Sequence, residues 1–178
     1  ADSDALGGTI QGADLSTVSI GGVGAVTGSA NFSADASSAN VKSETTGTTN
    51  SSEALSDVNI VDGLLSDSTT IKSDGTLNGL ASIDLGATAE STSGSKAYAE
   101  ADAGTLQGAQ LEGVTSIGGV GTVAGSTNLS SSAAASNVSG IAQGLSTLYQ
   151  AEGLDLDAKL EVSSDASVSG TAGINSSA

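Results

Sequence analysis

The residues of this sequence that could do chemistry are carboxylates. Asp155 and Asp157 alternate with apolar residues in LDLDAKLEV, so both side chains fall on one face of an extended strand, about 7 Å apart. Asp2 and Asp4 repeat this spacing. Since Ca²⁺ takes carboxylate oxygens as ligands, these four residues form the candidate metal site, with calcium as its ion. Alternating acids are also typical of a solvated strand face, which is the competing interpretation.

The other residue types exclude most catalytic chemistry. Without His or Cys, the chain lacks both the nucleophile and base pairs of hydrolases and the usual zinc ligands. The glycine-rich segment GGVGAV lacks the following helix and the acidic partner of a dinucleotide-binding motif, so we interpret it as tight packing between sheets or a bulge. We therefore expect no enzymatic activity and no cofactor other than calcium.

The charge of the chain limits its partners. The sequence has 20 acidic residues and 4 basic ones, which gives a formal net charge of −16. Nucleic acid is excluded as a partner, because binding it requires clustered Lys or Arg. No apolar run approaches the roughly 18 residues of a membrane helix, so we expect no membrane insertion.

The chain begins with ADSDALGG and has no initiator Met. A small residue followed by an acidic stretch is what cleavage of a secretory signal peptide leaves behind. We therefore expect an exported protein, located outside the cell or at the cell surface. A trimmed chain is the alternative explanation.

The apolar residues alternate with polar ones, which predicts β-strands. From Leu154, the alternation continues for about 15 residues, enough for a strand near 50 Å long. We predict an all-β protein of long-stranded, antiparallel, sandwich-like sheets. The alternative is a β-solenoid, with coils of roughly 20 residues and short strands as its sign. Turns between strands are expected at the glycine pairs Gly7-Gly8, Gly21-Gly22 and Gly118-Gly119, and at Asp74-Gly75 and Asn78-Gly79.

One segment occurs twice. IGGVGAVTGSANFSADASSANV at 20–41 recurs as IGGVGTVAGSTNLSSSAAASNV at 117–138, and TIQGADL at 9–15 recurs as TLQGAQL at 105–111. This duplication predicts two tandem repeats, residues 1–101 and 102–178. The first repeat would carry a polar insertion near 42–58, which we interpret as a surface excursion.

The repeats also predict self-assembly. The end of the chain aligns near Gln107, where a third repeat would begin, and no Pro protects the strand edges. We expect copies of the chain to polymerise head to tail, with strand exchange as one form of the joint. An ordinary two-domain protein is the alternative. The expected joint residues are Leu6, Ile10 and Leu15 on an N-terminal strand, and Leu160, Val162, Val168 and Ile174 on a C-terminal strand.

In its bias toward Gly, Ala, Ser, Thr and Asn and its few aromatic residues, the composition resembles that of secreted microbial fibre and biofilm-matrix proteins. The predicted function is therefore that of a structural subunit of an extracellular filament or biofilm-matrix fibre. The alternative is a non-catalytic adhesin or carbohydrate-binding module that binds surface glycans. Such a module needs an exposed aromatic platform, for which Tyr98 and Tyr149 are the candidates.

Overall fold

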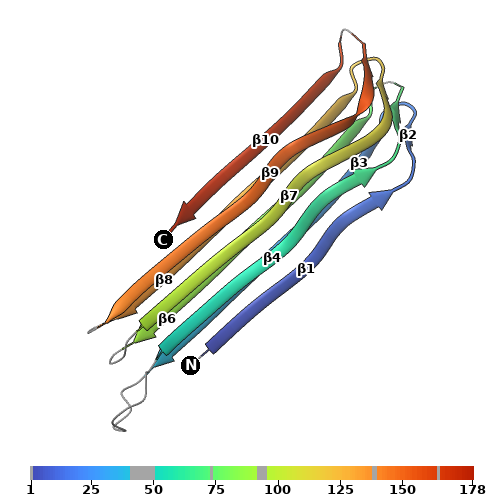
Figure 1. Ribbon diagram of the computed structural model, residues 1–178. Coiled ribbons are helices and arrows are strands. Elements are labelled where there is room, and N and C mark those ends of the chain that lie inside the picture. The colour runs from blue at the N-terminus through green and yellow to red at the C-terminus, as the bar shows by residue number, and fades with distance from the viewer. Residues whose placement is uncertain (1, 41–50, 73, 92–95, 138–139, 164) are drawn as a thin grey trace.

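The computed structural model describes residues 2–40, 51–72, 74–91, 96–137, 140–163 and 165–178, and these residues form strands, turns and short connections. Figure 1 shows long strands side by side in two layers. Within the described residues, no helix has the length and apolar character needed to span a membrane. The strands are β1 (Asp2–Leu15), β2 (Val18–Ile20), β3 (Ala25–Asn40), β4 (Ser51–Ser66), β5 (Thr69–Ile71), β6 (Thr76–Ser91), β7 (Lys96–Ile117), β8 (Thr122–Asn137), β9 (Ile141–Val162) and β10 (Ser167–Ser177).

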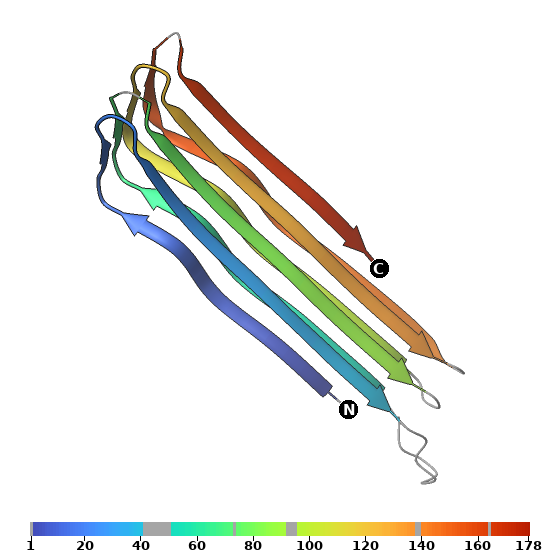
Figure 2. The same cartoon turned by 180° about the vertical axis from the view of Figure 1, so that it is seen from behind.

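Every pairing between these strands is parallel. The first sheet contains β1, β4, β7 and β9 with the short strands β2 and β5, and the second has the order β10-β8-β6-β3. The chain passes along the first sheet and returns along the second, so each circuit makes one coil of a β-solenoid (Figures 1 and 2). The predicted antiparallel sandwich is therefore wrong, and the solenoid alternative describes the fold.

The physical reason for this error is that alternation shows which side chains share a face of a strand. It does not show which strands are neighbours or in which direction they run. A strand with one buried face shows the same period of two in a parallel or an antiparallel sheet. Gly22 and Gly119, with φ of 91° and 64°, do lie in turns, but these turns join strands of opposite sheets. No hairpin therefore forms there.

The coil period also differs from the expectation. Asp2 pairs with Glu53, Glu53 with Tyr98, and Tyr98 with Gln143, so one coil takes 51 residues and each of the next two takes 45. The coils are long because a strand of 14 to 22 residues spans the first sheet. The structure has four coils among the described residues, and the duplicated segment recurs two coils apart.

The predicted polar insertion divides into two parts. Residues 41–50 lie outside the described residues, whereas 51–58 form the first half of β4. That half of β4 pairs with β1 on one side and β7 on the other, so it belongs to the sheet and is not a surface excursion. The predicted repeat boundary after residue 101 lies within β7.

Two columns of glycine face each other across the interior. In the second sheet, Gly28, Gly79, Gly125 and Gly170 are register partners in successive coils. Gly12, Gly63, Gly108 and Gly153 lie between paired residues of the first sheet. A Cβ built at Gly79 would overlap the carbonyl oxygen of Gly108, and one built at Gly125 would overlap that of Gly153. We call these eight residues the glycine waist, because the backbones of the two sheets touch there.

The glycine waist separates the core into two apolar clusters. Val61 and Leu106 precede the waist in the first sheet and belong to the cluster that extends away from the turns. Leu64 and Ala109 follow the waist and belong, with Ile71, to the cluster nearest the turns. The close contact of the two backbones at the waist therefore divides the core into these two clusters.

The waist yields a stability prediction. Gly79→Ala should lower the free energy of unfolding by about 3 kcal/mol, because its Cβ would meet backbone that no rotamer change can move. Gly8→Ala is the matched control, since no atom lies within 4 Å of a Cβ built there. This control should change stability by less than about 1 kcal/mol in urea unfolding. Equal effects of the two substitutions would contradict the waist as a packing constraint.

Candidate functional site

The candidate functional surfaces are the two ends of the solenoid. At one end β1 and β3 are edge strands, and at the other end β9 and β10 are. Within the described ranges, no further strand pairs with the outer side of any of these four (Figures 1 and 2). An edge strand presents a row of backbone N–H and C=O groups that can pair with another chain.

The predicted N-terminal residues all lie on β1. Ile10 packs against the core cluster away from the turns, and Leu15 packs against the cluster near them. Leu6 points outward and is 66% exposed. Ile10 and Leu15 are only half-buried, whereas their partners Val61 and Leu111 in later coils are fully buried. The structure thus places Ile10 and Leu15 on the open end of the core.

The predicted C-terminal residues lie on the two strands of the last coil. Leu160 and Val162 end β9, and Val168 and Ile174 lie on β10. Val162 is 43% exposed although its register partner Ile117 is 2% exposed. Ile174 is 57% exposed and lies in a column whose inner members are buried. Val168 is half-buried, whereas Val162 and Ile174 are exposed where no further described coil covers them.

The pairing of β1 is relevant to the predicted strand exchange. From Asp2 to Leu15, β1 pairs in register with β4 of its own chain. Among the described residues, each end of the solenoid therefore has one long strand in each sheet, and the outer edges of these strands are unpaired. An end-to-end joint between two such copies needs no strand to leave its own sheet.

The predicted calcium ligands fall into two separate places. Asp155 and Asp157 lie on β9, whereas Asp2 and Asp4 lie on β1, and β4 and β7 separate these strands. Among the described residues, no three acidic, His or Cys side chains gather closely enough to hold a metal ion. The side-chain amide of Gln107 donates to Asp155 Oδ2 at 3.4 Å. Calcium binding therefore stays a prediction and receives no support from this geometry.

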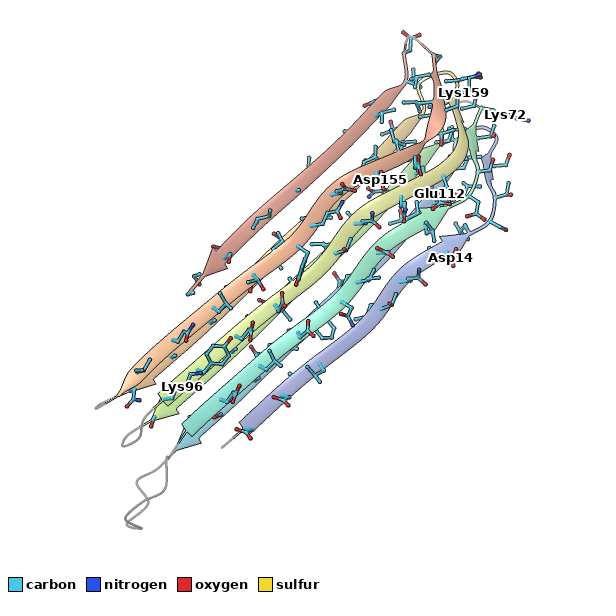
Figure 3. The ribbon with its side chains drawn as sticks, viewed as in Figure 1. Asp14, Lys72, Lys96, Glu112, Asp155 and Lys159 are labelled. Carbon is cyan, nitrogen blue, oxygen red and sulfur yellow. The ribbon has the colours of Figure 1, made fainter. Side chains whose placement is uncertain are left out.

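Carboxylates of neighbouring coils instead stack along the first sheet. The register partners Glu112 and Asp157 of β7 and β9 are one such pair, and Figure 3 shows Glu112 and Asp155 on these two adjacent strands, with Asp14 on the edge strand β1. Burial raises the pKa of Asp155, and the charges of Glu152 and Asp157 raise it further. Parallel register places equivalent positions side by side, so like charges become neighbours.

Asp62 is the functional candidate that the sequence pattern did not identify. Its side chain is 6% exposed, and its Oδ1 has no hydrogen-bond partner. Burial raises the pKa of this carboxyl, and a hydrogen bond with the Gln11 side chain opposes part of that increase. The alternation of β4 shifts around Gly63, so position 62 cannot be assigned to a face from period two alone.

Comparison of the chain with protein-family models, with curated proteins and with solved structures finds no match in any of the three. The functional argument therefore depends on the geometry of this chain alone.

Asp62 gives a pH prediction. A folded pKa above the ordinary 3.8 means that the folded chain binds more protons than the unfolded chain between these two pKa values, so stability falls as pH rises through that window. Asp62→Asn should raise the free energy of unfolding at pH 7 and weaken its dependence on pH between 4 and 7. Urea unfolding across this range measures both effects.

Asp14→Asn is the control for charge alone, because it removes one carboxylate from the exposed side of β1. It should change stability by no more than about 0.5 kcal/mol. A loss of stability in Asp62→Asn at neutral pH would show that the buried carboxylate stabilises the fold in its charged form.

Proposed function

We propose that the chain is a structural subunit of an extracellular filament, in which copies stack end to end and the solenoid continues from one copy to the next. The observation that carries the proposal is the exposure of core columns at the last coil, where Val162 is 43% and Ile174 57% exposed, together with the half-buried Ile10 and Leu15 of the first coil. Because all strands are parallel, the two ends differ, and joining unlike ends is a head-to-tail contact that need not close.

Continuing the coil register across a joint brings apolar side chains together. Leu15 and Leu156 belong to one column, separated by two coils, so a second copy would place its Leu15 beside Leu156. The other apolar columns of the core continue across the joint in the same way. Residues of the second copy would lie beside residues of the first as follows: Val18 beside Leu160, Ile20 beside Val162, Val26 beside Val168, and Phe32 beside Ile174.

The glycine waist supports the same joint. The first coil presents Gly12 and Gly28 at its open edge, and the last coil presents Gly153 and Gly170. A joint in coil register therefore aligns the waist of one copy with that of the next. No bulky side chain interrupts the close approach of the two sheets.

At most positions of this joint, no two carboxylates of neighbouring copies lie side by side. In the continued register, Asp2 would lie beside Gln143 and Asp4 beside Leu145. Asp14 would lie beside Asp155, which is the unfavourable pair on this sheet. Repulsion between the remaining charges is screened over about 8 Å at physiological ionic strength.

The extracellular location and the matrix role belong to this proposal, and they rest on composition. A Gly-, Ala-, Ser- and Thr-rich chain with few aromatic residues resembles secreted microbial fibre proteins. The experiments below test the homopolymeric partner.

Filament dimensions provide the direct test. Each copy contributes four strands to the second sheet, so stacked copies should give an axial repeat of about 19 Å, with strands about 4.8 Å apart along the axis. Electron microscopy and fibre diffraction of the purified chain measure both spacings. Uniform 16.8 kDa monomers at all concentrations, pH values and salt conditions would overturn the proposal.

A charge placed at the joint should prevent assembly. Val162→Asp should raise the critical concentration for filaments tenfold or more, because burying a Val side chain contributes about 1.5–3 kcal/mol and a buried carboxylate opposes it. Val120→Asp is the matched control, since Val120 is 54% exposed in a turn away from both edges. Sedimentation measures assembly, and circular dichroism confirms that both variants fold. Equal effects on assembly would exclude the proposed joint.

A further inference from the structure

The outer face of the first sheet contains an open hollow of about 510 Å³. It lies across β4, β7 and β9, where the register of all three strands omits one position. Asn59, Gly104 and Tyr149 occupy the omitted positions. The hollow therefore follows from a local irregularity that adjacent coils share.

Gly104 explains why the surface is hollow at this point. It lies between Asn59 of β4 and Tyr149 of β9, and it has no side chain to fill the space between them. A Cβ built at Gly104 would overlap the carbonyl oxygen of Asn59, so only glycine fits. The ring of Tyr149 remains 80% exposed beside this gap.

Two carboxylates line the same hollow. Asp57 and Asp102 are register partners on β4 and β7, and the Thr147 hydroxyl donates a hydrogen bond to Asp102 Oδ1. Burial raises the pKa of Asp57, and the charges of Asp102 and Glu100 add to this effect. The ion pair that the described residues form is Lys159 with Glu161, so no described lysine neutralises the two carboxylates of the hollow.

We propose that this hollow binds a protonated amino sugar of a cationic glycan. The ammonium group would lie between Asp57 and Asp102, where two adjacent carboxylates concentrate negative charge. The pyranose ring would pack against the exposed Tyr149 ring, and its hydroxyls would hydrogen-bond with Thr105 and Gln150.

Other ligand classes fit this set of residues less well. No three metal-ligating side chains gather anywhere in the described ranges, so a divalent cation would find only two carboxylates here. A neutral sugar would leave the paired carboxylates without a positive partner. A simple ammonium ion would use neither the aromatic ring of Tyr149 nor the side chains of Thr105 and Gln150.

The site is complete within one copy of the chain, so the inference does not depend on filament formation. In a filament, each copy would present the same hollow, and a cationic polysaccharide could occupy several hollows at once. Such multivalency raises the apparent affinity without any new contact.

The test is calorimetric titration of the intact chain with a glucosamine oligomer and with a glucose oligomer of equal length, at physiological salt. The glucosamine oligomer should bind at least tenfold more tightly. Tyr149→Ala and Asp102→Asn should each weaken its binding tenfold or more, whereas the glucose oligomer should respond little to either change.

The chain offers a matched control for each variant. Tyr98→Ala removes the other tyrosine of β7 and β9, whose hydroxyl donates to Glu100 Oε2 at 2.7 Å outside the hollow. Asp155→Asn removes a carboxylate from a different part of the same sheet. Both controls should leave glucosamine binding within twofold of that of the unchanged chain.

Four results would overturn the inference. These are no binding of the glucosamine oligomer, equal binding of the two sugars, equal weakening by all four variants, and tighter binding of a lysine oligomer that also depends on Tyr149. The third result would indicate general attraction to the acidic chain, and the fourth would indicate a site for ammonium groups rather than for sugars. Since the hollow lies within one copy of the chain, none of these results bears on the end-to-end joint.

Discussion

Contact between the two backbones at the glycine waist is the constraint on which the rest of this structure depends. Side chains at Gly79 or Gly125 would force the sheets apart, because backbone atoms of the opposite sheet already occupy that space. The interior on either side is consequently shallow and suits Ala, Val, Leu and Ile. Phe32 fits because it faces Gly7, where a Cβ would lie 2.6 Å from the phenyl ring.

The same constraint makes the coils alike. Once the waist sets the distance between the sheets, each coil presents similar backbone edges and similar apolar columns to the next. A coil that ends the chain therefore has the same form as one in the middle, as Val162 shows beside its buried partner Ile117. The fold thus has no intrinsic length, and this property connects the packing to the proposed filament.

Parallel register has an electrostatic consequence on the outside of the solenoid. Equivalent positions of successive coils become neighbours, so acidic residues repeated in the sequence become rows of carboxylates. Asp57 beside Asp102 and Glu112 beside Asp157 are examples from the first sheet. Where the register also omits a position, as at Gly104, such a row lines a hollow and gains a binding geometry that neither carboxylate has alone.

The local alternation of apolar and polar residues predicted several features of this protein. It predicted an all-β chain. The strand of about 15 residues expected from Leu154 is wrong in its bounds, because β9 begins at Ile141 and ends at Val162, before the turn that leads to β10. The alternation also placed Leu160 and Val162 on the apolar face of β9, because residues two positions apart in a strand share a face. Tyr149 was identifiable because the chain has so few aromatic residues.

Only the tertiary structure decided which strands are neighbours, and with them the parallel direction and the coil period. It also placed Gly7-Gly8 and Asn78-Gly79 inside strands rather than in turns. Asp57, Asp102 and Tyr149 meet only because their strands are adjacent in the sheet. Strand neighbours and close backbone contacts join residues about 45 or more positions apart, and no local pattern in the sequence specifies such partners.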